Sequence, residues 1–163
     1  MKYLADMLTS FTRIESFTIP IRVRKGIWHR IRFSDVDLDD LIRFCQTVNE
    51  ENRFSLYKRI ADLCLFILGM FPEYVVMDYR YPFRRETRPK MFGRWRRSIE
   101  DYEEEGRRFY KLAGNHDDAA ILHLNDVLNN LHDKFNLAKK PLNHISAYIL
   151  QFRRDKLFQL PSS

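Results

Sequence analysis

The fold is decided by residues 54–70, which read FSLYKRIADLCLFILGM and form the most apolar stretch of the chain. Charge interrupts this stretch only at Lys58, Arg59 and Asp62, and Gly69 lies next to its end. A helix that carries apolar side chains around most of its circumference is packed by other elements on most sides. We therefore expect residues 54–70 to form the central helix of the protein.

Helical patterns continue on both sides of this stretch. The three-and-four spacing of apolar residues predicts further helices over residues 2–14, 34–48, 95–113, 121–135 and 141–152. Ser34 is expected to cap the second of these helices, and Pro141 to occupy the first turn of the last. Gly106 costs helix stability unless another helix approaches closely, so we expect such an approach there, near Gly69. The pattern predicts an all-α fold, an antiparallel bundle of five or six helices in a single domain over residues 1–163.

Residues 17–33 depart from the helical pattern. Ile19, Ile21 and Val23 alternate with polar or basic residues, and Gly26 can turn the chain before a second alternating run begins. A period of two around a glycine is typical of a β-hairpin. We expect one small hairpin beside the helices.

The composition is that of a globular domain. The 163 residues fit one domain, and contents of 45% hydrophobic and 14% aromatic residues exclude a disordered chain. Cys45 and Cys64 have no partner at disulfide or zinc-site spacing, and no phosphate-cradling glycine loop or dinucleotide fingerprint occurs, so no metal or cofactor is predicted. The chain start lacks a secretory signal and no apolar run is long enough to span a bilayer, so we expect a cytoplasmic protein.

The largest concentration of charge is the Arg-rich segment, residues 80–97, which holds eight basic residues and one acidic residue. Prolines and the absence of a helical period predict a long irregular connection over residues 77–92. Guanidinium groups bind phosphates and aromatic rings stack on bases, so the mixture of both favours RNA or single-stranded DNA as a partner. The predicted nucleic-acid-binding residues are Arg84, Arg85, Arg88, Arg94, Arg96 and Arg97.

Two alternatives account for the same charges. The arginines can pair with the acidic run at residues 100–105, in the same chain or in a second subunit, because charge runs are often structural pairs. The protein is then an interaction or assembly subunit that binds an acidic protein partner, and a homodimer is plausible. The predicted hairpin favours the first interpretation, since its own basic cluster widens the phosphate-binding surface. That cluster consists of Arg22, Arg24, Lys25, Arg30 and Arg32, with Trp28 and His29.

Asp62 is the one carboxylate in the most apolar helix. A buried carboxylate must be paired or hydrogen-bonded, and Arg59, Tyr102 and Tyr110 are the expected partners. A pocket formed by Asp62, Tyr102 and Tyr110 is the alternative, and it makes a small helical enzyme a third hypothesis. We assign no catalytic residue, and a non-enzymatic role is favoured.

Two histidine-aspartate doublets, at 116–117 and 132–133, invite comparison with metal-dependent phosphohydrolases. His123 and His132 lie on opposite sides of one continuous helix, and His116 and His123 are about 10 Å apart along it. The spacing therefore does not predict a metal site.

Two segments resemble parts of a group of uncharacterised bacterial helical proteins. They are residues 59–66 continuing to 69–73, and residues 101–110. The group has no established activity, so the resemblance implies no function and no residue roles. It draws attention to Asp62, Glu73, Tyr102 and Gly106.

Overall fold

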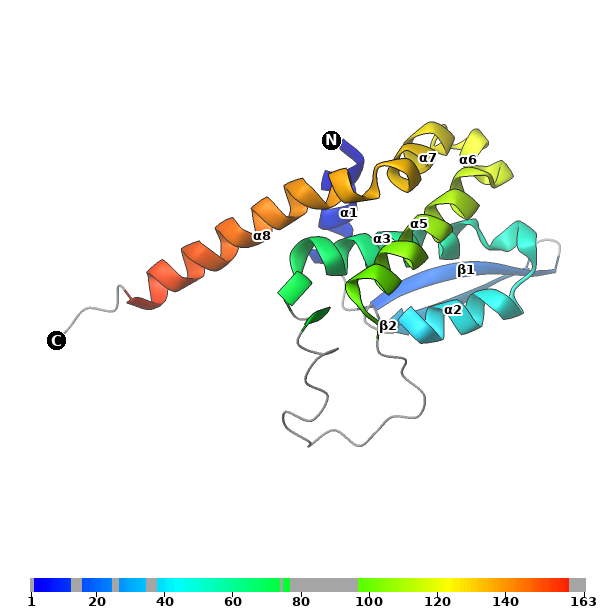
Figure 1. The fold of residues 1–163 in the computed structure, drawn as a ribbon. Coiled ribbons are helices and arrows are strands. Elements are labelled where there is room, and N and C mark those ends of the chain that lie inside the picture. The colour runs from blue at the N-terminus through cyan, green and yellow to red at the C-terminus, as the bar shows by residue number, and fades with distance from the viewer. Residues whose placement is uncertain are drawn as a thin grey trace.

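The computed structural model describes residues 2–12, 16–24, 27–34, 38–73, 75–76 and 97–158, with side chains described for residues 2–11, 38–73, 75–76 and 97–148. Figure 1 shows a body of helices, a two-stranded hairpin beside it and a long helix that extends away from it. The elements are α1 (Lys2–Thr12), β1 (Ser16–Arg24), β2 (Ile27–Ser34), α2 (Leu38–Thr47), the 3-10 helix η1 (Glu50–Asn52), α3 (Phe54–Met70), α5 (Ile99–Gly114), α6 (Asp117–Ile121), α7 (Asn125–Asp133) and α8 (Phe135–Phe158). The predicted all-α class is confirmed for the described residues.

Helix α3 is the central helix, with the bounds that its sequence predicts. Ile60, Ala61 and Leu65 are fully buried. Helix α5 packs antiparallel to α3, since Tyr57 near the start of α3 meets the Phe109 ring near the end of α5 at 5.8 Å between ring centroids. The apolar circumference of α3 is thus covered by α5, α8 and α2.

Gly106 marks a close approach between helices, as predicted. A Cβ atom at this position would lie 2.9 Å from the Cβ of Cys64 on α3 and 2.6 Å from Cε2 of Phe135 on α8. Gly69 does not face Gly106. It lies against Leu142 of α8, where an added Cβ would come within 2.5 Å of the leucine Cβ. The two glycines therefore allow two separate close contacts of α3: Gly106 allows the contact with α5, and Gly69 allows the contact with α8.

The single helix predicted over residues 121–135 is wrong. The chain forms α6, then α7, and begins α8 at Phe135. His123 has a φ of 55°, a left-handed conformation that ends a helix. Leu128 and Leu131 are buried from α7 and Phe135 from α8. The three-and-four spacing of apolar residues thus continues across the breaks between α6 and α7 and between α7 and α8. It does so because successive helices pack their apolar residues against the same core.

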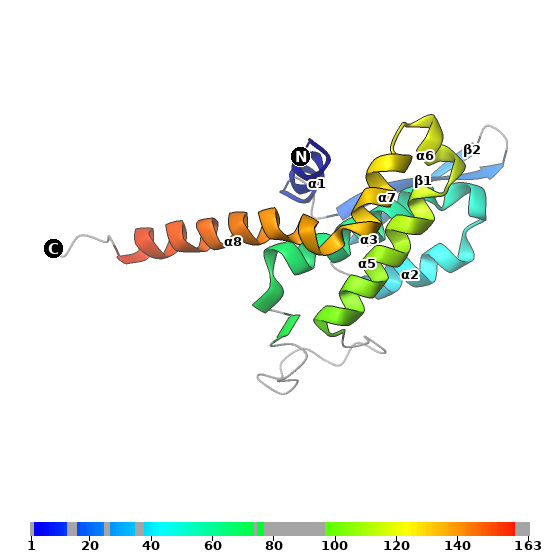
Figure 2. The same ribbon diagram turned by 45° about the horizontal axis from the view of Figure 1, so that its top comes forward.

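Pro141 lies inside α8 and not in its first turn. Leu142 and Ser146 hold this part of α8 against α3, the serine hydroxyl donating to the carbonyl of Met70 at 2.6 Å. Helix α8 runs parallel to α3, and Figure 2 shows its later turns projecting beyond the body. No helix in the described part of the chain has the length and apolar content needed to cross a membrane.

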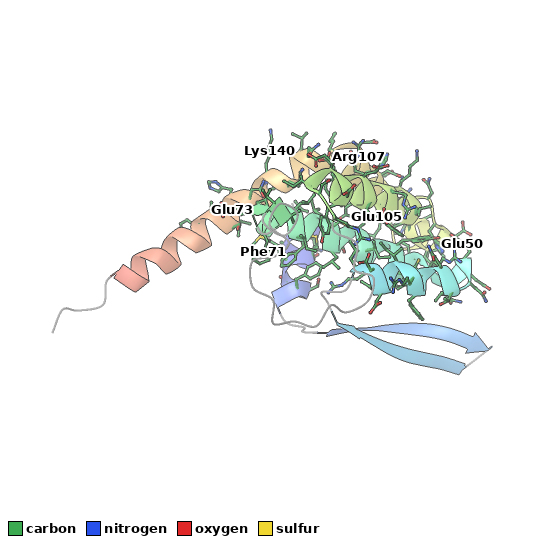
Figure 3. The ribbon with its side chains drawn as sticks, turned by 60° about the horizontal axis from the view of Figure 1, so that its bottom comes forward. Glu50, Phe71, Glu73, Glu105, Arg107 and Lys140 are labelled. Carbon is green, nitrogen blue, oxygen red and sulfur yellow. The ribbon has the colours of Figure 1, made fainter. Side chains whose placement is uncertain are left out.

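The hairpin joins β1 and β2 in antiparallel register, with Phe17 opposite Phe33 and Arg22 opposite Trp28. Its backbone contacts are mainly between its own strands, and Figure 3 shows it lying along one side of the helical body. Ser34 ends β2, and α2 begins at Leu38, so Ser34 does not immediately precede the helix it was expected to cap.

Candidate functional site

Arg97 closes the Arg-rich segment and is tied into the helical body. The predicted binding residues Arg84, Arg85, Arg88, Arg94 and Arg96 lie outside the described residues, as does the predicted irregular connection. Arg97 places its Nη2 atom 2.5 Å from Oδ1 of Asp39, and the two side chains are only 15% and 9% exposed. Burial opposes the guanidinium charge, but the hydrogen bond and the negative charge of Asp39 raise the pKa of Arg97.

The Asp39–Arg97 ion pair joins two segments that are far apart in the sequence. Asp39 lies in the first turn of α2, where a negative charge also favours the helix N-terminus. Three residues lie between Ser34, the end of β2, and Leu38, so the Cα atoms of Ser34 and Leu38 are about 14 Å apart at most. The end of the Arg-rich segment therefore lies close to the base of the hairpin (Figure 1).

The hairpin register sorts its residues onto two faces. Directly opposed residues share a face, and each strand alternates between the faces. One face carries Phe17, Ile19, Ile21, His29, Ile31 and Phe33, and the other carries Thr18, Pro20, Arg22, Trp28, Arg30 and Arg32. The register is irregular between Arg22 and Arg24. The hairpin thus has an apolar face and a basic face, and the basic face holds its tryptophan.

The acidic run at residues 100–105 has partners within the helices. Ser98 caps α5 and exchanges hydrogen bonds with Asp101, a capping box that the sequence analysis missed although serine and aspartate stand three residues apart. Glu103 pairs with Lys139 at 3.1 Å and accepts a hydrogen bond from Asn136.

Glu105 pairs with Arg108 at 2.9 Å, one turn along the same helix. The three carboxylates of Asp101, Glu103 and Glu105 thus have partners at the N-cap of α5, on α8 and on α5 respectively. The described arginine of the Arg-rich segment, Arg97, pairs with Asp39 instead.

Asp62 is buried, with its residue only 2% exposed, and both of its carboxylate oxygens receive donors. The hydroxyls of Tyr3 and Tyr110 each donate to Oδ1 at 2.8 Å, and Lys58 donates to Oδ2 at 2.8 Å. Burial and then the Asp62 charge raise the pKa of both tyrosines well above its ordinary value. Three donors around one buried carboxylate are what a structural anchor between α1, α3 and α5 requires.

The expected partners of Asp62 were only partly identified from the sequence. Tyr110 is one of them. Tyr102 is partly buried at the edge of the core, and Arg59 donates to the Ser10 hydroxyl at 3.1 Å and lies over the Phe11 ring. Tyr3 was missed because it is 59 residues from Asp62, whereas Lys58 lies one turn before the aspartate and carries the four-residue helical spacing that could have identified it.

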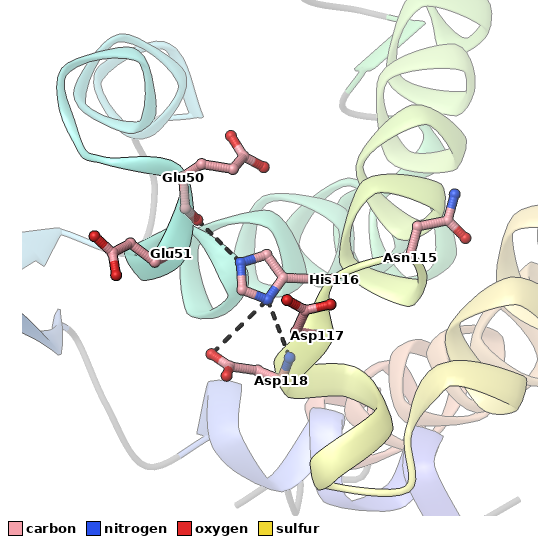
Figure 4. Close-up of a pocket in the computed structure, with 6 residues that line it drawn as sticks. All are labelled: Glu50, Glu51, Asn115, His116, Asp117 and Asp118. Atoms are coloured by element: carbon pink, nitrogen blue, oxygen red, sulfur yellow. Dashed lines mark hydrogen bonds and ion pairs between the residues drawn. The ribbon is translucent and has the colours of Figure 1, made fainter.

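A cleft with acidic walls lies where η1 meets the junction of α5 and α6 (Figure 4). Its lining residues are Glu50, Glu51, Asn115, His116, Asp117 and Asp118. The His116 Nδ1 atom accepts a hydrogen bond from the backbone N–H of Asp118 at 3.2 Å, so Nε2 carries the proton that it donates to the Glu50 carbonyl at 2.9 Å. His116 is therefore the N-cap of α6 and the connection to η1.

The second histidine doublet is equally tied to backbone groups. His132 Nδ1 lies 2.9 Å from the Arg107 carbonyl, and the Arg107 Nε–H donates to the His132 carbonyl at 3.1 Å. These reciprocal bonds hold α7 against α5. Among the residues that the structure describes, no three His, Cys, Asp or Glu side chains are arranged to hold a metal ion.

No protein-family model matches the sequence, and neither the curated proteins nor the solved structures contain a match. The assignment of function therefore depends on the residues and geometry of this chain.

Proposed function

We propose that the protein is a non-enzymatic module that binds RNA or single-stranded DNA. Its surface is formed by the basic face of the hairpin and by Arg84, Arg85, Arg88, Arg94 and Arg96 of the Arg-rich segment. Arg97 serves this surface as the anchor that fixes the end of the segment to Asp39. Guanidinium groups supply bidentate contacts to phosphates, and the interleaved aromatic residues supply stacking.

The ion pair between Asp39 and Arg97 is the observation that carries this proposal. It brings the end of the Arg-rich segment next to the base of the hairpin, so two basic segments far apart in the sequence start from one corner of the helical body. A nucleic-acid strand is longer than either segment and gains affinity from every phosphate that it can reach. Two basic segments that start close together can bind one strand at more phosphates than either segment alone.

The distribution of charge supports the same assignment. Residues 16–34 hold five basic and no acidic residues, and residues 80–97 hold eight basic residues and one acidic residue. The rest of the chain holds 15 basic and 21 acidic residues, a formal charge of −6, although the whole chain carries +6. The positive charge is thus concentrated in the hairpin and in the Arg-rich segment.

Fluorescence anisotropy with labelled single-stranded RNA and DNA tests the proposal. We expect micromolar binding at about 50 mM salt, and between about 50 and 200 mM the affinity should fall roughly 20- to 300-fold for three to six phosphate contacts. The triple substitution Arg84→Glu/Arg85→Glu/Arg88→Glu should weaken binding at least tenfold, because each substitution replaces an attraction to phosphate by a repulsion.

A matched control changes the net charge equally on the helical body. Lys111→Glu/Lys134→Glu/Lys140→Glu alters three exposed lysines on α5, in the connection before α8 and on α8 (Lys140 is labelled in Figure 3). This control should retain nearly all of the affinity. Absence of binding at about 50 mM salt contradicts the proposal, and so does an equal loss in both triple variants.

Assembly as a homodimer is the second candidate, and helix α8 favours it. Leu137, Ile145 and Tyr148 share one face of α8 with Pro141 and are 55%, 39% and 68% exposed. This face is distinct from the one that Leu142 and Ser146 pack onto α3. An exposed apolar stripe at helical spacing is a typical contact surface between protein chains.

A further inference from the structure

The basic face of the hairpin has an internal order that the sequence does not reveal. Along β2, residues 28, 30 and 32 alternate onto this face, with successive positions about 7 Å apart. Trp28 comes one residue after the start of β2 and lies opposite Arg22, so it belongs to the turn end of the hairpin. Arg32 belongs to the other end, where β2 leads on to α2. Along this face, Arg32 therefore lies toward the Asp39–Arg97 ion pair and Trp28 lies near the turn.

Trp28 and His29 adjoin in sequence but belong to opposite faces. His29 lies opposite Ile21, on the face that also carries Ile19 and Ile31. A two-stranded hairpin is marginally stable in water unless its apolar face packs against another element. Trp28 is thus separated from this apolar face and shares its own face with Arg22, Arg30 and Arg32.

We infer that the basic face of the hairpin is a stacking site for unpaired bases, in which Trp28 stacks on one base while Arg22, Arg30 and Arg32 bind the neighbouring phosphates. This inference rests on the proposed function and narrows its ligand to single strands. An indole ring offers a flat surface that stacks on any base, but a base inside a duplex has both of its faces covered by its neighbours. Arginines alone bind the phosphates of single strands and duplexes alike, so on this face of the hairpin Trp28 is the residue that favours single strands.

The intrinsic fluorescence of Trp28 provides a direct test. The chain has two tryptophans, so the substitution Trp95→Phe leaves Trp28 as the only tryptophan, whose emission is then excited selectively at wavelengths that tyrosine does not absorb. We expect titration with an unlabelled oligothymidine to quench this emission, because stacking brings the base into contact with the indole ring. A duplex of the same length should produce much less quenching at equal occupancy, with occupancy measured by anisotropy.

Affinity measurements on three variants complete the test. Trp28→Ala should weaken single-strand binding roughly 5- to 150-fold, the range for loss of one stacked base, and should leave duplex binding within about twofold. Trp28→Phe retains an aromatic ring and should keep most of the single-strand affinity. His29→Ala, on the opposite face, is the matched control and should leave both affinities unchanged.

The outcomes separate this inference from the proposed function. If the wild type binds but Trp28→Ala leaves its single-strand affinity unchanged, or weakens duplex and single strand equally, the stacking site is wrong and the binding module stands. The same holds if Trp28→Phe loses as much affinity as Trp28→Ala. If the wild type binds neither form at about 50 mM salt, the proposed function fails and the stacking site fails with it.

Discussion

At the scale of single residues, the cluster around Asp62 makes the fold sensitive to alkaline pH. Tyr3 and Tyr110 donate hydrogen bonds to the buried carboxylate, and their pKa values are raised above the ordinary value of 10.0. A raised pKa in the folded state means that the native protein holds a proton that the unfolded chain loses first. Their contribution to stability is therefore present in full below about pH 10 and is lost as the pH rises further.

We expect the free energy of unfolding to fall by roughly 1.4 kcal/mol per pH unit above 10 for each of the two phenols. Urea unfolding at a series of pH values measures this slope. Tyr3→Phe should reduce the slope and should lower stability at neutral pH by about 1–3 kcal/mol, because Asp62 loses a donor. A wild-type slope that Tyr3→Phe and Tyr110→Phe leave unchanged contradicts this account.

At the scale of elements, local pattern explains what could be predicted and long-range contact explains what could not. The bounds of α3 could be predicted because they coincide with an apolar run that is recognisable in the sequence. The break at His123 depends on a left-handed residue, and neighbouring residues continue the helical period across it. The nucleic-acid-binding hypothesis came from the composition of the Arg-rich segment. The Asp39–Arg97 pair joins two segments far apart in the sequence, and no local pattern in either segment predicts that they are in contact.

The contact of α3, α5 and α8 at Gly106 leads to a second stability prediction. Gly106→Ala should lower the free energy of unfolding by about 2 kcal/mol, because the added methyl group overlaps the Phe135 ring and the gain in helix propensity only partly offsets this. Chemical denaturation of a double-mutant cycle with Phe135→Leu checks the cause. The smaller leucine should tolerate the added methyl group better, so the double variant should lose less stability than the two single changes added together. Strict additivity would place the strain elsewhere.

At the scale of the whole molecule, the apolar stripe of α8 predicts association between two copies of the chain. Size-exclusion chromatography with light scattering should give twice the monomer mass at micromolar concentration. Leu137→Lys/Tyr148→Lys places two charges on the stripe and should give a monomer that unfolds with unchanged cooperativity. Ile121→Lys, at an exposed apolar residue on α6, is the control and should remain a dimer. A wild type that is monomeric at these concentrations excludes the homodimer.

The three donors of Asp62 also bear on how the chain folds during its synthesis. Tyr3 and Lys58 precede the aspartate, but Tyr110 follows it by 48 residues. At 5–20 residues per second the ribosome needs roughly 2–10 seconds to add those residues. Through that interval the last donor of the Asp62 carboxylate has not been synthesised, and neither has the part of α5 that covers it. The central helix can therefore be covered by α5 only after the ribosome has passed the Arg-rich segment, so this part of the core is completed late in translation.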